Sequence, residues 1–428
     1  MAVPNSVSAM TSIRDHKGLD RLRPLRRAGV LGAAVLTAFA VTAGPAASAA
    51  SAADGIDRID QGLEKLTDKL EKAGESPTTA PNNVDLVQQG LENLVKKHKF
   101  PAALASVRGR DGQVRNYTAG VGDLKTKSEV PVDGFVRIGS NTKTFTAVMV
   151  LQLVEEGKVK LDAPVEKYLP GLIRGNGNDG RRITVRQVLQ HTSGLPNYTN
   201  FFADKGLEPF QHTYFQPLET LRIALQQKRS FKPGTKWEYS NTNYSVAGLI
   251  IEKVTGRPYI EELNKRIIKR IGLQNTYLPN VGDQTVREPH AKGYHVDDPK
   301  KPLKDYTVSD PSFGWAAGAI IARPSDVNRF FRALLDGELL GKKMLAEMKK
   351  TVPAAELGKG AGYGLGLAGY KLSCGRAWGH GGDIPGYHTT NAATEDGRAA
   401  IVALTRLPRE LKELESTQKV LDDALCKG

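Results

Sequence analysis

The sequence predicts an α/β fold in which a mainly antiparallel sheet, flanked by helices, is built from both ends of the chain. An inserted all-helical region is expected between the two contributions. Three observations support this prediction: strand patterns with turns occupy 102–119 and 364–405, helical periodicity dominates 136–311, and a last helix is expected over 411–425. Because strands both precede and follow the helical part, we expect the two chain ends to meet in one sheet.

Each expected element has a local signal. Helices are expected where apolar residues recur close to every 3.6 positions, and strands where apolar residues alternate or a Gly/Ala run permits close packing. The expected helices are 84–97, 142–154, 185–190, 218–227, 244–254, 325–335 and 411–425. The expected strands are 102–107, 114–119, 316–322, 364–372, 376–378, 387–393 and 399–405.

The composition is that of an ordinary globular protein. The 428 residues are 40% hydrophobic and 25% charged, which excludes collagen, a wholly disordered chain and a polytopic membrane protein. The formal net charge is +14, so the moderately basic surface either attracts anionic polymers or is a solvated face without a specific partner. No Lys/Arg-rich run is interleaved with aromatic residues, so nucleic acid is not expected as a partner.

Residues 1–52 have the pattern of an export signal peptide. The basic segment 21–27 precedes the apolar stretch 28–43, and small-residue cleavage sites follow at 47–49 and 50–52. The apolar stretch is short for a membrane span, and no cysteine follows it that a lipid anchor would need. We therefore expect a secreted, extracytoplasmic protein with no stable membrane anchor.

The rest of the chain is expected to contain a short leader and one large domain. Apolar residues at steps of three and four predict an amphipathic leader helix and a Pro/Thr/Asn linker within 53–83. The large domain is expected to span 84–428. Its sheet region would be 84–135 and 312–428, and its helical region 136–311.

The chain has two cysteines, Cys374 and Cys426. In an exported protein two such thiols are more readily explained as a disulfide than as free cysteines. A bond between them would stabilise the fold by about 4 kcal/mol and attach the last helix to the segment that contains Cys374. Two distant cysteines without clustered histidines do not make four metal ligands, so neither a metal site nor a cofactor is expected.

The first chemical motif is Ser140-Asn141-Thr142-Lys143, at the start of a predicted helix. Ser140 and Lys143 are three residues apart, so they share a helix face and the amine can reach the hydroxyl. A lysine can take the proton of a serine only if desolvation or nearby positive charge lowers its pKa. The helix N-terminus adds free N–H groups that can stabilise an oxyanion. The same spacing at Ser416 and Lys419 is interpreted as an exposed patch on the last helix.

Two further motifs follow along the chain. In Tyr239-Ser240-Asn241, a tyrosine flanked by cationic groups can ionise below its usual pKa of about 10 and transfer a proton. The Asn241 side chain can donate to a substrate carbonyl. In His380-Gly381-Gly382, the glycines suit a strand that a substrate backbone approaches closely.

The order of these motifs resembles that of the penicillin-recognising serine hydrolases, which include the serine D-alanyl-D-alanine carboxypeptidases and the class C β-lactamases. It is most similar to the secreted actinobacterial carboxypeptidases, whose third motif starts with His. The likeness covers roughly 84–428 and implies the β-lactamase/DD-peptidase-like fold. It includes the segments 135–140, 151–171, 183–194, 233–256, 315–322, 363–367 and 372–375.

The resemblance implies a role for each motif. Ser140 would be acylated, with Lys143 and Tyr239 as the proton-transfer pair, and His380 would form the far wall and add positive character. The oxyanion hole would use the backbone N–H groups of Ser140 and Asp383. The expected substrate-binding residues are Asn241, Gly381, Gly382, Asp383 and Trp315, of which Trp315 either lines the cleft or belongs to the core.

The activity implied is that of a secreted D-alanyl-D-alanine carboxypeptidase acting on the D-amino-acid-containing peptides of peptidoglycan, with β-lactams as inhibitors. The alternatives are a D-stereospecific amidase or esterase, a β-lactamase, and a non-enzymatic β-lactam-sensing or wall-binding module. His191 is expected to order a loop beside the site.

Two departures from the resembled pattern bear on the substrate. Gly381 and Asp383 stand where the carboxypeptidases have hydroxyl residues, and 368–371 lacks the arginine expected there. An added acid disfavours a substrate carboxylate by like-charge repulsion. We therefore expect substrates without a C-terminal carboxylate, unless Asp383 points away and Lys371 replaces the arginine.

Overall fold

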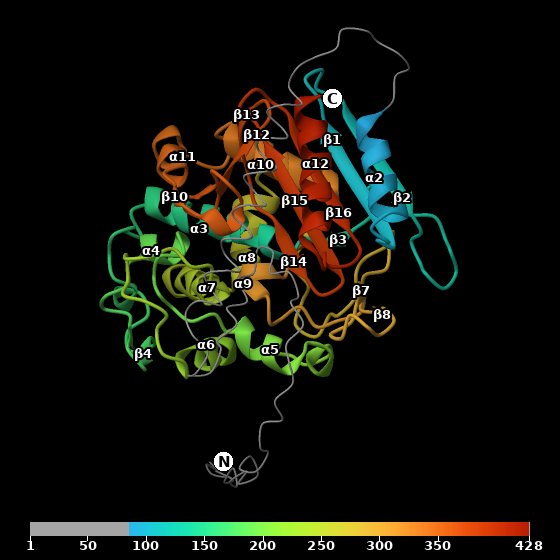
Figure 1. Cartoon of the computed structure of the whole chain (residues 1–428). Helices are drawn as coiled ribbons and strands as arrows, with labels where there is room; N and C mark the ends of the chain where they lie inside the picture. Colours follow the sequence, from blue (N-terminus) through green and yellow to red (C-terminus); the bar gives the residue numbers. More distant parts are fainter. Residues whose placement is uncertain (1–84, 428) are drawn as a thin grey trace, which may run out of the picture. The chain divides into compact units, whose positions relative to one another are not determined.

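A computed structural model describes residues 85–427 of the chain (Figure 1). The expected signal peptide, leader helix and linker lie outside the described residues. Within the described part, no helix is long and apolar enough to cross a membrane.

The two ends of the described chain meet in one antiparallel sheet, as predicted. Its strand order is β10-β11-β12-β13-β15-β16-β1-β2, and β14 pairs with β15. Ala103 of β1 lies opposite Leu404 of β16 in register. The strands are β1 (Ala102–Arg108), β2 (Val114–Gly120), β10 (Val352–Pro353), β11 (Gly362–Tyr363), β12 (Ala368–Leu372), β13 (Gly375–Gly379), β14 (Gly382–Ile384), β15 (Tyr387–Ala393) and β16 (Ala399–Leu404).

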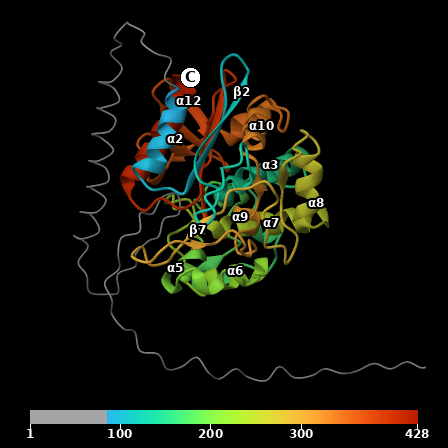
Figure 2. The same ribbon diagram turned by 90° about the vertical axis from the view of Figure 1, so that its right-hand side faces the viewer.

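Helices cover both faces of this sheet (Figure 2). On one face, α2 (Leu86–Lys96) and α12 (Leu411–Cys426) pack side by side against β1 and β16. On the other face lies α10 (Pro324–Leu335), followed along the chain by α11 (Lys342–Met348). Because β1 and β16 are covered on both sides, their residues are almost all buried and read as continuous apolar runs.

A disulfide between Cys374 and Cys426 joins the turn after β12 to the end of α12. The two residues are 52 positions apart in the chain, and their Cα atoms are 5.4 Å apart. The structure thus confirms the predicted pairing and the attachment of the last helix.

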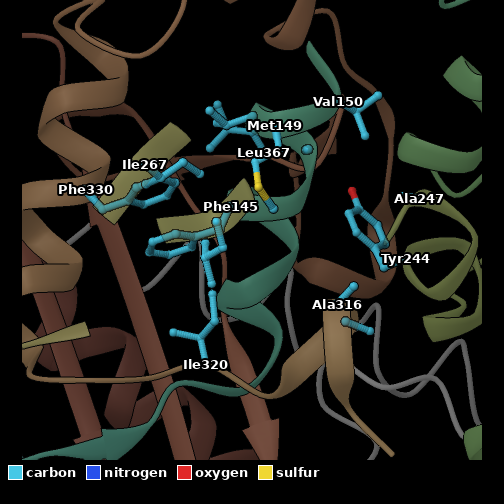
Figure 3. Close-up of a cluster of buried hydrophobic side chains, with 14 of the residues drawn as sticks. Phe145, Met149, Val150, Tyr244, Ala247, Ile267, Ala316, Ile320, Phe330 and Leu367 are labelled. Atoms are coloured by element: carbon cyan, nitrogen blue, oxygen red, sulfur yellow. The ribbon is translucent and has the colours of Figure 1, made fainter. Parts of the chain in front are cut away.

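The middle of the chain is mainly helical and is organised around α3 (Thr142–Glu155). Nearly all of α3 is buried, because other helices surround it. Phe145 stacks on Phe330 of α10, and Figure 3 shows Met149 and Ile267 in the same cluster. The other helices are α4 (Val185–Leu189), α5 (Thr199–Lys205), α6 (Pro217–Leu225), α7 (Asn241–Thr255), α8 (Tyr259–Leu263) and α9 (Trp315–Gly318), with a π-turn at Asn264–Ile268 and 3-10 turns at Gly139–Asn141, Val165–Lys167, Glu208–Phe210 and Ala355–Leu357.

The fold class is confirmed, with two corrections to the middle of the chain. The inserted region is not all helical, because short strands form three small sheets. These are β3 (Val136–Arg137), β9 (Ile321–Ala322) and β6 (Thr276–Tyr277) in one sheet, β4 (Arg174–Gly175) with β5 (Asn178–Asp179), and β7 (Tyr294–His295) with β8 (Lys304–Asp305). The predicted strand 316–322 is instead the short helix α9 followed by β9, because its small residues let α9 pack tightly against α3 and α7.

A third correction concerns the predicted strand 364–372. The chain turns at Gly366, whose φ is +77°, so β11 and β12 are separate strands. A Cβ at Gly366 would lie 2.3 Å from the Ala147 side chain on α3. The turn therefore brings the sheet edge into direct contact with the central helix.

Candidate active site

Ser140 lies in the 3-10 turn that leads into α3, close to the start of β14. The turn is possible because Gly139 adopts a φ of +50°, which side-chain-bearing residues rarely adopt. A Cβ on Gly139 would also lie 2.9 Å from the backbone nitrogen of Asp383. The preceding glycine therefore brings the backbone beside Ser140 against the third motif, as the predicted oxyanion hole requires.

Lys143 is fully buried, and its Nζ makes three polar contacts. Nζ lies 2.9 Å from Ser140 Oγ, 2.7 Å from Asn241 Oδ1 and 2.8 Å from the carbonyl oxygen of Ala317. A neutral amine has two N–H donors and one lone pair, so it can donate to the two carbonyl oxygens and accept the Ser140 proton. Within residues 85–427, no carboxylate contacts Nζ.

Burial favours this neutral form of the amine. Desolvation lowers the pKa of Lys143 well below its ordinary value, and the negative charge of Asp383 only partly opposes the shift. The sequence motif required a lysine with a lowered pKa, and the structure provides desolvation as the cause. The serine hydroxyl therefore faces a base that is ready to accept its proton.

Tyr239 lies on the other side of the amine, with Nζ 4.9 Å from the centre of its ring. Its hydroxyl has no hydrogen-bond partner within the described residues. Burial raises the pKa of Tyr239 well above its ordinary value, although its nearness to Ser140 opposes the shift. The expectation that cationic neighbours lower this pKa is therefore wrong. Tyr239 is a protonated phenol that can donate its proton.

The polar atoms of the Asn241 side chain form hydrogen bonds with other residues of the protein. Its Oδ1 accepts a hydrogen bond from Lys143, while its Nδ2 donates to Asn197 Oδ1 and Thr199 Oγ1, each at 3.3 Å. The resemblance implied that Asn241 holds the substrate amide. In this structure it orients the lysine, and a substrate carbonyl would have to replace one of the long Nδ2 bonds.

His380 is buried and both of its ring nitrogens are engaged. Nδ1 lies 2.6 Å from the carbonyl oxygen of Gly381, to which it donates, so Nε2 accepts from the Tyr363 hydroxyl at 2.9 Å. Burial lowers the pKa of His380 to about 3. The expected positive character is therefore wrong, and His380 is a neutral wall residue.

The rest of the third motif lies directly against the first. A Cβ at Gly382 would lie 2.0 Å from the carbonyl oxygen of Ile138, so only glycine fits there. The next side chain, Asp383, places Oδ1 2.5 Å from Nδ1 of His388, and its buried Oδ2 has no hydrogen-bond partner within the described residues. Lys371 is exposed on β12.

Trp315, expected either to line the cleft or to belong to the core, packs among helices. A Cβ at Gly248 of α7 would lie 2.7 Å from its ring, and the Tyr259 ring of α8 is 5.3 Å away. The indole is therefore partly buried and packs between α9 and the neighbouring helices, against the core. The adjacent segment contributes to the site through the backbone carbonyl of Ala317 instead.

Sequence reasoning missed the polar network that joins the first and third motifs. Asn141 Nδ2 donates to Thr389 Oγ1 at 2.8 Å. Asn391 donates to Asn141 Oδ1 and, at 2.9 Å, to the carbonyl oxygen of His380. Thr389 and Asn391 stand at alternate positions of the strand 387–393 and so share a face. They were the available signal, since a buried polar side chain needs a partner.

These contacts define the class of protein. A buried serine beside a neutral amine and a protonated phenol can attack a carbonyl carbon and pass its proton on, which is acyl transfer through a covalent intermediate. Residues 85–427 contain no group of side chains that could hold a metal ion. The fold and the site are those of a serine hydrolase.

Comparison with known proteins places this hydrolase in a family. Residues 86–425 match the Beta-lactamase family model, so the chain belongs to this family of penicillin-recognising serine hydrolases. Among curated proteins, a penicillin-binding protein of Bacillus subtilis (strain 168) is 28% identical over 284 residues. The match covers 66% of this chain and 65% of that relative, which is slightly less than two thirds of its length.

Two solved structures share the fold over most of this chain. A D-stereospecific amidohydrolase from Streptomyces sp. is 39% identical with a TM-score of 0.74, and the match covers 81% of this chain and 100% of that one. A D-amino acid amidase from Ochrobactrum anthropi SV3 is 28% identical with a TM-score of 0.70, and the match covers 79% of this chain and 96% of that one.

Proposed function

We propose that this protein hydrolyses amides or esters of D-amino acids through an acyl-enzyme on Ser140, and that it favours substrates without a C-terminal carboxylate. The observation that carries the proposal is the carboxylate of Asp383, whose charge acts on both Lys143 and Tyr239. The similarity to a D-stereospecific amidohydrolase and to a D-amino acid amidase supports the D-configured substrate.

The proposed reaction begins with acylation. Ser140 Oγ forms a bond to the substrate carbonyl carbon, and its proton passes to the lone pair of Lys143 Nζ. The backbone N–H groups of Ser140 and Asp383 stabilise the oxyanion. The bond from carbon to the leaving nitrogen or oxygen then breaks, the leaving group takes the Tyr239 proton, and Lys143 returns its proton to the phenolate.

Deacylation uses the same groups in reverse. Water loses a proton to the Tyr239–Lys143 pair as its oxygen bonds to the acyl carbon. The ester bond to Ser140 breaks, and the proton returns to Oγ. The D-amino acid is released, and both half-reactions leave the enzyme in its starting protonation state.

The negative charge of Asp383 favours this reaction over that of a carboxypeptidase. A carboxypeptidase must accept a leaving residue that carries a negative charge, and Asp383 places a second negative charge near the reacting atoms. Lys371, which would replace the missing arginine, is exposed rather than turned into the site, and the side chain that contacts the Asp383 carboxylate is His388. We therefore rank the D-amidase or D-esterase above the carboxypeptidase that the motif order alone implied.

Replacing Asp383 with asparagine is expected to raise kcat/KM for a D-Ala-D-Ala peptide acid relative to its amide by about tenfold, or about 1.4 kcal/mol in the transition state. The reason is the loss of like-charge repulsion with little change of shape. Both substrates are compared above the pH at which Lys143 becomes neutral, since Asp383 also affects that amine. Asp162→Asn, at an exposed ion pair with Arg186, is the matched control. A wild-type enzyme whose kcat/KM is tenfold higher for the acid than for the amide would contradict the proposal.

We also propose that residues 84–428 form the catalytic domain and that the protein is exported, with peptidoglycan-derived D-peptides as one source of substrate. The basic and apolar pattern of residues 1–52 supports export. Because the family includes penicillin-binding proteins, β-lactams are expected to acylate Ser140. Rapid turnover of that adduct would favour the β-lactamase alternative, and a permanent adduct with no hydrolysis of D-amides would favour the sensor.

A further inference from the structure

His191 lies directly behind Tyr239, on the loop that follows α4. It is fully buried and adopts a φ of +61°, in the left-handed region. Its ring centre is 4.3 Å from that of Tyr239, 5.3 Å from that of Tyr244 and 4.9 Å from that of Tyr363. An imidazole at this point fills the centre of a cluster of aromatic rings around the phenol.

Hydrogen bonds fix the orientation of this imidazole. Nδ1 accepts from the backbone N–H of Ser240 at 3.2 Å and from Asn243 Nδ2 at 3.1 Å. Ser193 Oγ donates to Asn243 Oδ1 at 2.6 Å, which sets the direction of the Asn243 amide. The proton of the neutral ring is therefore on Nε2, which has no hydrogen-bond partner within the described residues.

The Tyr239 hydroxyl makes no hydrogen bond within residues 85–427, so polar contacts do not hold the phenol in place. Its ring is held by its neighbours instead, and its backbone is held through the Ser240 N–H that binds His191. Among these neighbours the His191 ring is the nearest, because the centres of Trp237 and His380 are more than 6 Å away.

We propose that His191 is a positioning residue, which holds the Tyr239 ring beside Lys143 and keeps water away from the amine. This inference rests on the proposed acyl-enzyme, because it assigns to His191 the support of the proton-transfer pair. It goes beyond the role of a loop-ordering residue, since it predicts that His191 affects the chemistry at Nζ, which it does not touch.

Few charged groups act on Lys143, so we expect His191 to affect the pKa of the amine through its desolvation. The carboxylate whose charge acts on Lys143 within the described residues is Asp383. The rings that face the amine are those of Tyr239 and Tyr244, both raised in pKa and therefore uncharged at neutral pH. Burial also keeps His191 neutral, by lowering its pKa well below the ordinary value. Water admitted behind Tyr239 would therefore raise the pKa of the lysine toward its ordinary value.

The test is His191→Asn, followed by the rate at which a fluorophosphonate labels Ser140 between pH 5 and 10. Asparagine tolerates a positive φ and keeps a hydrogen-bond acceptor for Ser240, but it lacks the ring. We expect labelling to slow by about 10- to 100-fold. We also expect the midpoint of its acid limb to move up by about one pH unit, as water raises the pKa of Lys143. His212→Asn makes the same change at an exposed histidine and should leave both values unchanged.

A merely structural role would lower the amount of active enzyme without moving the midpoint, and that result would overturn the inference. If His191→Asn does not fold, Asn243→Ser removes one donor to Nδ1, keeps every ring, and should move the midpoint in the same direction by less. A wild type that does not react with the probe would also contradict the inference. Labelling requires no D-amide hydrolysis, so failure of the proposed substrate class is recognised separately.

Discussion

Replacing Lys143 with methionine is expected to lower kcat by about 10²- to 10⁴-fold. Methionine has a similar length and suits a buried site, but it cannot accept the Ser140 proton or return one to Tyr239. Because the lost interaction belongs to proton transfer, KM should change little. Lys253→Met, at an exposed position on α7, is the matched control.

The same substitution tests the protonation state of the lysine. The pKa of Lys143 is lowered in the folded protein, so the unfolded chain binds a proton that the folded chain lacks. Stability must then rise with pH between the folded pKa and the ordinary value of about 10.4. The melting temperature of the wild type relative to Lys143→Met should therefore increase from pH 7 toward pH 10. A pH-independent difference, or a variant that keeps more than a tenth of wild-type kcat, contradicts a neutral lysine base.

Gly382→Ala is expected to destabilise the fold by about 1–3 kcal/mol or more and to abolish measurable acylation. The added methyl group would lie 2.0 Å from the carbonyl oxygen of Ile138, which is backbone and cannot rotate away. Either β14 moves from the turn that carries Ser140, or that turn moves, and both displace the proposed oxyanion hole.

Gly318→Ala is the matched control for this substitution. Gly318 is also buried near the site, on α9, but a Cβ there would have its nearest neighbour at 3.9 Å. Thermal melting and fluorophosphonate labelling of both variants distinguish the effect of the close contact between residue 382 and Ile138 from the general effect of adding a methyl group. Equal behaviour of the two variants would mean that the contact between β14 and Ile138 is not what shapes the site.

The parts of the fold and site that could be predicted are those with local or repeated signals. The three-residue spacing of Ser140 and Lys143 places them on one helix face, so they were predicted to meet without knowledge of the fold. The strands at 387–393 and 399–405 have enough residues to show a pattern, whereas two-residue strands such as β3 and β9 have none.

What could not be predicted depends on burial and on backbone atoms. The charge states of Tyr239 and His380 follow from desolvation, and a sequence motif does not reveal how much water reaches a ring. The hydrogen bond from Lys143 to Ala317 uses a carbonyl group that every residue has, so no residue type marks it. The sequence did not decide whether Trp315 lines the cleft or belongs to the core, because an aromatic residue suits either place.

The acylation of Ser140 is tested most directly by intact-protein mass spectrometry after acid quenching. The wild type and Ser140→Ala are each mixed with benzylpenicillin and with a D-amino-acid ester. We expect the wild type to gain the mass of the acyl group, on the peptide that contains Ser140, and the variant to gain none. A wild type without an adduct from either reagent, or an adduct that Ser140→Ala retains, would contradict a serine nucleophile activated by Lys143.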